Sequence, residues 1–225
     1  MEELGVVYKG EAPFSPDFIV PGQLGEGLQD TGYVMYLRGL EVEPTADSEV
    51  LSPMIKPYFN RTWRHFCSHL HSPAQGPAEY PGAVRNGNCI YFMHPLFGQY
   101  DQNAPLWCKK LVGNALDLLL PDPLLQAGGP SAALFTINEQ PDEGRLVVHA
   151  LCYVPERRGR DFDVIEDIIP LYDVPVSVRP PARLTEVRLV PQSEVLEFQE
   201  KDGRVELVIP KIEGHQMVAL QMGRS

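Results

Sequence analysis

Proline and glycine are spread along the whole chain, and they limit the length of every regular element that it can form. The 225 residues include 22 prolines and 19 glycines, and this proline content is about twice the usual ~5%. Proline removes a backbone hydrogen-bond donor and glycine favours turns, so long helices are not expected. The sequence therefore predicts a body of short elements that is rich in β-strands.

Composition and charge narrow the possible partners. The 44% hydrophobic and 22% charged content is typical of a folded, soluble protein. The net charge is -11, and the one basic cluster, residues 157–160, is followed at once by acidic residues. Nucleic acid is therefore not an expected partner, because phosphates need an uninterrupted basic stripe. No run of ~18 apolar residues predicts a membrane span, and the acidic start lacks the basic residues of a signal peptide. A cytoplasmic location is expected.

The four cysteines lie too far apart in sequence for any C-x-x-C pair. They are Cys67, Cys89, Cys108 and Cys152. This spacing argues against a zinc ribbon and against a thioredoxin-type redox site. We expect free thiols that are packed as small apolar side chains.

Several segments carry clear structural signals. Asn86 and Gly87 stand between two β-like runs, which predicts a hairpin with a two-residue turn. Leucine, valine and alanine recur at helical spacing over residues 105–120, which predicts one amphipathic helix ended by Pro121. Residues 33–42 and 49–55 are β-like, and from residue 130 onward seven short strands with turn signals predict a sandwich.

Histidines cluster between residues 65 and 94. If that segment were helical, His65 and His69 would share a face and could bind zinc, with Cys67, Cys89, His94 or Asp101 completing the site. However, the H-E-x-x-H pattern is missing, so no glutamate is placed to activate a metal-bound water. We favour hydrogen-bonded or pocket-lining histidines, and expect neither a metal nor a cofactor.

The segment from Tyr91 to Tyr100 leaves a predicted strand and enters a loop before the helix, a position where ligands often bind. It suggests a polar pocket that could stack against and hydrogen-bond a sugar. The alternative is that Tyr100 and Trp107 are core or interface aromatics, which we favour. The candidate binding residues are Trp63, His65, His71, Gln99, Tyr100, Asn103 and Trp107.

Motifs for covalent or phosphate chemistry are missing from the sequence. There is no G-x-S-x-G elbow, no S-x-x-K and no glycine-rich phosphate loop. A hydrolase site built from histidines and carboxylates would have to draw on residues 61–103. Its candidate catalytic residues are His69, His94 and Asp101.

Seven strings taken together resemble the C-terminal part of β-galactosidase-like glycoside hydrolases that carry a trimerisation domain. They lie at residues 4–8 (LGVVY), 11–18 (EAPFSPDF), 58–63 (YFNRTW), 66–69 (FCSH), 91–97 (YFMHPLF), 114–121 (NALDLLLP) and 214–218 (GHQMV). The resemblance implies an α/β domain over residues 1–127, the C-terminal portion of a flavodoxin-like fold related to class I glutamine amidotransferases. It implies a small antiparallel β-sandwich over residues 130–225.

The same resemblance implies that the chemistry lies elsewhere, because such enzymes hold two catalytic glutamates in an N-terminal barrel. A barrel needs ~250 residues, more than this chain offers. We therefore expect a non-catalytic accessory region that forms homo-oligomers and contacts carbohydrate through residues 65–100. The alternative is an independent small hydrolase that acts on glycosides or esters.

Overall fold

The structure is a computed structural model that describes residues 2–223. The chain divides into two compact units, Met1–Pro121 and Asp122–Ser225. Strand β8 (Leu125–Ala127) follows the division and already pairs with a strand of the second unit. Each unit has its own hydrophobic core.

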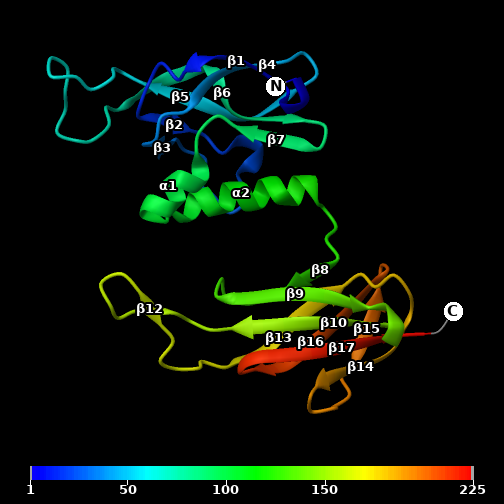
Figure 1. The fold of residues 1–225 in the computed structure, drawn as a ribbon. Coiled ribbons are helices and arrows are strands. Elements are labelled where there is room, and N and C mark those ends of the chain that lie inside the picture. Colours follow the sequence, from blue (N-terminus) through cyan, green and yellow to red (C-terminus); the bar gives the residue numbers. More distant parts are fainter. Residues whose placement is uncertain (1, 224–225) are drawn as a thin grey trace. The chain divides into compact units, whose positions relative to one another are not determined.

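The first unit is built on an antiparallel sheet of five strands (Figure 1), in the order β3-β2-β5-β6-β7. A separate pair, β1 with β4, is also antiparallel. The predicted hairpin is confirmed, since β6 pairs with β7, but its turn lies one residue further along than expected. Asn86 is the last residue of β6 and pairs with Cys89, and the two turn residues are Gly87, with a φ of +55°, and Asn88. The strands are β1 (Val6–Glu11), β2 (Asp17–Ile19), β3 (Tyr33–Met35), β4 (Leu40–Pro44), β5 (Glu49–Pro57), β6 (Ala74–Asn86) and β7 (Cys89–Phe92).

Helices contribute little to this unit. Its α-helices within residues 2–223 are α1 (Leu96–Asn103) and α2 (Leu106–Leu119), and short 3-10 turns lie at Glu2–Leu4 and Gly22–Leu24. The predicted helix over residues 105–120 is confirmed as α2. It buries Cys108, Leu111 and Ala115 against the core of the unit.

The prediction of a flavodoxin-like α/β domain was wrong. A parallel sheet needs a crossover of a dozen or more residues, usually a helix, between its strands, whereas every strand pair of this unit is antiparallel. Both helices follow the last strand instead of separating strands. Prolines at positions 53, 77 and 81 accompany register shifts between β5 and β6, so even the longest pairing is irregular.

The second unit is built on two four-stranded antiparallel sheets that enclose one core, and it also has a separate short antiparallel pair, β11 with β12. The strand orders are β14-β17-β10-β9 and β15-β16-β13-β8. Besides β8, the strands are β9 (Ala133–Gln140), β10 (Arg145–Cys152), β11 (Glu156–Arg157), β12 (Asp163–Val164), β13 (Leu171–Val178), β14 (Leu184–Val190), β15 (Phe198–Lys201), β16 (Arg204–Ile212) and β17 (Gly214–Met222), and a 3-10 turn lies at Pro141–Glu143.

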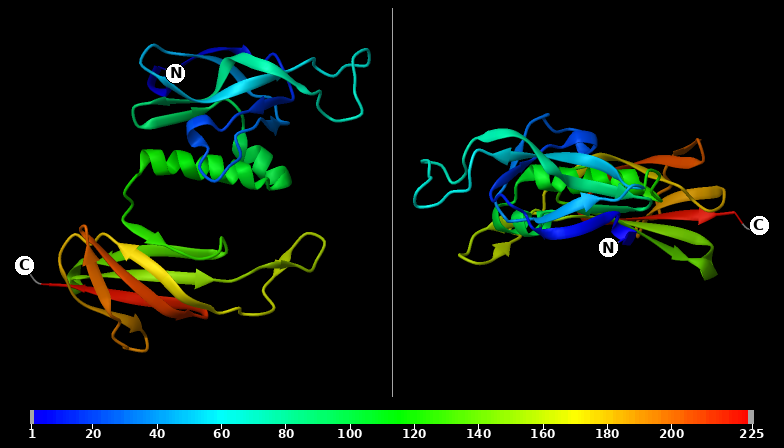
Figure 2. Two further views of the ribbon diagram at one scale, coloured as in Figure 1. Left: turned by 180° about the vertical axis from the view of Figure 1, so that it is seen from behind. Right: turned by 90° about the horizontal axis from the view of Figure 1, so that it is seen from above.

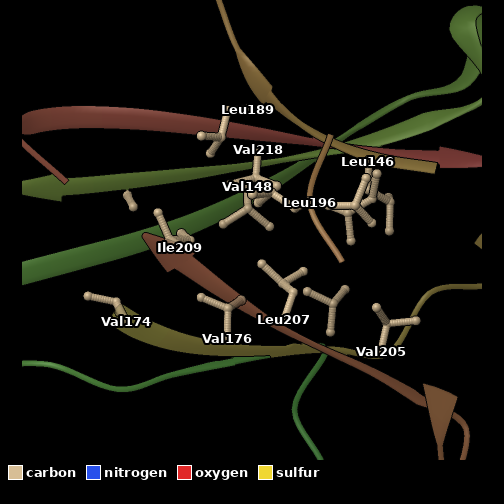
Figure 3. Close-up of a cluster of buried hydrophobic side chains, with 14 of the residues drawn as sticks. Leu146, Val148, Val174, Val176, Leu189, Leu196, Val205, Leu207, Ile209 and Val218 are labelled. Atoms are coloured by element: carbon tan, nitrogen blue, oxygen red, sulfur yellow. The ribbon is translucent and has the colours of Figure 1, made fainter. Parts of the chain in front are cut away.

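Alternating burial along the strands explains this arrangement. On β16, Val205, Leu207 and Ile209 are buried, while Glu206 and Val208 between them are exposed. Val148 of β10 and Val218 of β17 meet this row from the opposite sheet (Figure 3). A period of two buries one face of each strand, which is why the strands of this unit can be recognised from the sequence.

Candidate functional site

A long loop, residues 58–73, connects β5 to β6 and extends away from the sheet of the first unit (Figures 1 and 2). It holds four of the predicted site residues, namely Trp63, His65, His69 and His71. The segment has no helix, so the shared helical face on which the zinc hypothesis depended does not form. Within residues 2–223, no group of three or more His, Cys, Asp or Glu side chains could hold a metal ion.

The two ends of the loop are bonded to each other, and Asn60 fastens them to the segment after β1. The Tyr58 backbone N–H donates to the Pro73 carbonyl at 3.1 Å, and the buried Ser72 hydroxyl donates to the Phe59 carbonyl at 2.8 Å. The Asn60 amide donates to the Pro13 carbonyl at 2.7 Å and accepts from the backbone of Ser15 at 2.9 Å. The loop therefore starts and returns at a fixed place.

The middle of the loop presents large apolar side chains to solvent. Trp63 is 80% exposed, Phe66 71% and Leu70 64%. The Arg64 guanidinium lies 4.5 Å from the centre of the Trp63 ring, a cation–π contact. Exposed apolar groups gathered on one projecting segment are typical of a binding surface.

His71 lies where the loop rejoins the sheet. Its Nδ1 atom is 3.3 Å from the Tyr36 hydroxyl, and its ring packs edge-on to Phe18 at 5.7 Å. The ring of His69 stacks beside it at 6.5 Å. Both histidines thus border the aromatic base of the loop, while His65 is exposed nearer its middle.

His94 belongs to a buried polar network in the core of the unit. Its Nε2 atom lies 2.8 Å from Asp17 Oδ1, with both side chains about 1% exposed. The Tyr80 hydroxyl donates to Asp17 Oδ2 at 3.1 Å. Burial, reinforced by the neighbouring Asp17 charge, raises the pKa of Tyr80 far above its usual value of 10. The tyrosine is therefore a permanent hydrogen-bond donor to the carboxylate.

Gln99 is also buried, and both ends of its amide are used. Its oxygen accepts from the Tyr36 backbone N–H at 2.8 Å, and its nitrogen donates to the Val34 carbonyl at 2.9 Å. The side chain thus ties α1 to the end of β3. Its two hydrogen bonds hold the fold together and leave little for a ligand.

The other predicted residues lie on the helices. Tyr100 is 38% exposed, and Asp101 and Asn103 are exposed near the end of α1. Trp107 packs on Tyr33, with ring centres 5.2 Å apart. Within residues 2–223, no hydrogen bond, ion pair or ring contact joins any two of the three candidate catalytic residues, His69, His94 and Asp101.

Four residues of these clusters were missed by the sequence analysis. Asp17 and Tyr80 complete the buried network, and Tyr36 and Phe18 surround His71. They are 35 to 77 residues from their partners in sequence, so no local spacing indicated these contacts.

Of the comparisons with known proteins, the one with solved structures found a similar chain. No model of a protein family matches the chain, and no curated protein does. Among solved structures, the chain is similar to α-L-fucosidase isoenzyme 2 from Paenibacillus thiaminolyticus, with a TM-score of 0.91 and 34% sequence identity. The similarity covers 98% of this chain and 34% of the fucosidase chain. The chain thus spans about a third of the length of this glycoside hydrolase.

No helix within residues 2–223 is long and apolar enough to cross a membrane.

Proposed function

We propose that this chain is a non-catalytic accessory region of a glycoside-hydrolase-like protein, which assembles with further copies and contacts carbohydrate through loop 58–73. The observation that carries the proposal is the match over nearly the whole chain to only 34% of a fucosidase. A piece of that size lacks room for a barrel of ~250 residues, where the resemblance seen in the sequence implies the catalytic glutamates.

The candidate catalytic groups support a non-catalytic role. His94 is enclosed with Asp17 and Tyr80, and Asp101 is exposed on α1 without a hydrogen bond or ion pair to any residue in the range 2–223. A histidine acting as a general base must reach the proton that it abstracts. An imidazole with almost no exposed surface cannot reach a substrate in solution.

Loop 58–73 supplies the groups that sugars require. Trp63 offers a flat apolar surface for the C–H face of a sugar ring, and the histidines near the base offer donors and acceptors for hydroxyls. Because the similar protein is an α-L-fucosidase, L-fucose is the first sugar to test.

Sugar binding is tested by calorimetric titration of the full chain with L-fucose and with a fucosylated trisaccharide. Trp63→Ala should abolish the binding, because it removes the stacking surface. Phe97→Ala is a matched control, since this aromatic residue is 75% exposed but lies on α1, outside the loop. Equal losses in both variants, or no loss in Trp63→Ala, would contradict the assignment to the loop.

Catalysis and assembly need separate measurements. The purified chain should not hydrolyse 4-nitrophenyl α-L-fucoside or 4-nitrophenyl acetate above the buffer rate. Turnover that disappears in a folded His69→Ala or Asp101→Ala variant would instead establish an independent hydrolase. Light scattering should give a multiple of 25.2 kDa, and a monomer at all concentrations would refute self-assembly.

A further inference from the structure

A row of four polar side chains crosses one sheet of the second unit. Gln126 of β8 pairs with Ser177 of β13, which pairs on its other side with Glu206 of β16. Glu206 in turn pairs with Gln199 of β15. Paired residues of neighbouring strands point to the same face of a sheet, so each strand contributes one member to a continuous line, here called the polar row.

The polar row lies on the outer face of the sheet. Its neighbours along the strands, Val176 and Leu207, point into the core. All four residues of the row line an open hollow of about 1100 Å³. Pro175 and Val208, another exposed register pair, form an apolar strip beside the row in the same hollow. The surface is therefore polar along one line and apolar along the next.

The hydrogen-bonding capacity of the row is not used by the protein. The side chains of Gln126, Gln199 and Glu206 form no hydrogen bond or ion pair with any residue in the described range 2–223. Ser177 Oγ accepts a hydrogen bond from Arg204 Nε at 2.8 Å, and its own proton remains to be donated. The row thus offers two amides, one hydroxyl donor and one carboxylate acceptor to a ligand.

The charges of the hollow favour a neutral ligand. Glu206 and Glu197 both line it and would repel phosphate, sulfate or carboxylate groups. The guanidinium that contacts the row, that of Arg204, is 13% exposed and already bonded to Ser177 and to Asp122 at 2.7 Å. It is therefore not available to an anion. A neutral ligand that carries many hydroxyl groups matches this set of donors and acceptors.

We propose that this face is a second carbohydrate-binding surface, which holds a neutral oligosaccharide lying across the strands. Strands are 4.7–4.9 Å apart, so four of them make a row about 14 Å long, longer than a single sugar ring. The hydroxyls of the chain bond to the polar row, and its C–H faces cover Pro175 and Val208. This face belongs to the second unit, whereas loop 58–73 belongs to the first.

The test is titration calorimetry of the full chain with four neutral hexasaccharides, namely cellohexaose, xylohexaose, mannohexaose and β-1,4-galactohexaose. An anionic probe of the same length, hexagalacturonate, is titrated in parallel. We expect at least one neutral hexasaccharide to bind with a dissociation constant below 1 mM, on the order of a weak protein–ligand contact. We expect at least tenfold weaker binding of hexagalacturonate.

Substitutions in the polar row test whether the hexasaccharide binds at this face. Gln199→Ala combined with Glu206→Ala should weaken it at least tenfold, because two of the four polar partners are lost. Thr136→Ala is a matched control, an exposed polar residue on β9 in the other sheet of the same unit. Both row residues are exposed, so the thermal transition should not move.

Three outcomes would overturn the proposal: no binding of any neutral hexasaccharide at millimolar concentration, unchanged affinity in the double variant, or preference for hexagalacturonate. Failure here is distinguishable from failure of the loop. Trp63→Ala should leave hexasaccharide binding intact, and the Gln199→Ala, Glu206→Ala variant should leave L-fucose binding intact.

Discussion

The two units differ in the kinds of side chain that they bury. The first encloses charged and polar side chains among its apolar residues, namely Asp17, Ser52, Ser72, His94 and Gln99. The main core cluster of the second is made of apolar residues throughout. Gln216 is the one buried polar side chain of that unit within the described residues.

This difference follows from how each unit supplies hydrogen-bond partners to its backbone N–H and C=O groups. In the second unit, regular ladders of backbone hydrogen bonds pair each strand with its neighbours over seven or eight residues at a time. The first unit has short strands and irregular connections, so side chains supply the missing partners. Gln99 holds the backbone after β3, and the Ser52 hydroxyl donates to the Pro21 carbonyl at 2.8 Å. Irregular backbone therefore requires polar groups in the interior.

The largest expected effect is the loss of Asp17, because it is the shared partner of two buried groups. Asp17→Ala leaves His94 without its neighbouring carboxylate and the Tyr80 hydroxyl without its acceptor. Breaking a buried pair on one side costs about 3–5 kcal/mol. Urea unfolding followed by Trp107 fluorescence in a Trp63→Phe background should show that loss. Asp101→Asn, which removes an exposed carboxylate, should show none.

In the apolar core of the second unit, a substitution should lower stability only through the side-chain volume that it removes. Ile209→Ala is expected to cost about 3 kcal/mol, because the side chain is fully buried and leaves a cavity. Val208→Ala, one residue away on the outer face and 49% exposed, should change stability by less than about 0.5 kcal/mol. Similar effects of the two variants, measured by thermal unfolding, would break the assignment of inner and outer faces.

Alkaline pH should weaken the first unit more than the second. The pKa of Tyr80 is near 10 in the unfolded chain and higher in the folded one. Its contribution to stability is therefore complete below pH 10 and declines as pH rises further, by about 1.4 kcal/mol per pH unit. Tyr80→Phe should remove this part of the slope in unfolding measured from pH 9 to 11. An unchanged slope would show that Tyr80 ionises normally.

The smallest effects are expected at the exposed histidines. His65→Ala and His69→Ala should each change thermal stability by less than about 0.5 kcal/mol, because both side chains lie in solvent on loop 58–73. The corresponding His94→Ala variant should be destabilised far more. Equal shifts of the melting temperature in all three would abolish the distinction between buried and exposed members of the histidine cluster.

Sequence patterns were informative where local rules decide the structure. β-like runs between turn signals located the strands around Val148 and Val205, the Asn86-Gly87 signal predicted a hairpin, and leucine spacing predicted α2. These signals depend on residues only a few positions apart. One continuous strand expected over residues 33–42 is instead β3 and β4, interrupted where Gln99 binds the backbone of Tyr36.

Contacts between distant residues could not be predicted in this way. His94 and Gln99 were assigned to a polar pocket because they follow a strand and precede a helix, but both point into the core. Their partners lie some 60 or more residues away. A buried polar residue and a ligand-binding one look alike in sequence, because both are polar residues near the end of an element.

The position of β17 has a consequence for how the second unit is made. This strand is the last one described, yet it lies between β14 and β10 and pairs with both of them. During synthesis, the edges of β10 and β14 that pair with β17 stay unpaired until residue 222 has left the ribosome. Open strand edges invite pairing with other chains, so a nascent chain stalled before β17 is the form of this protein that should most need a chaperone.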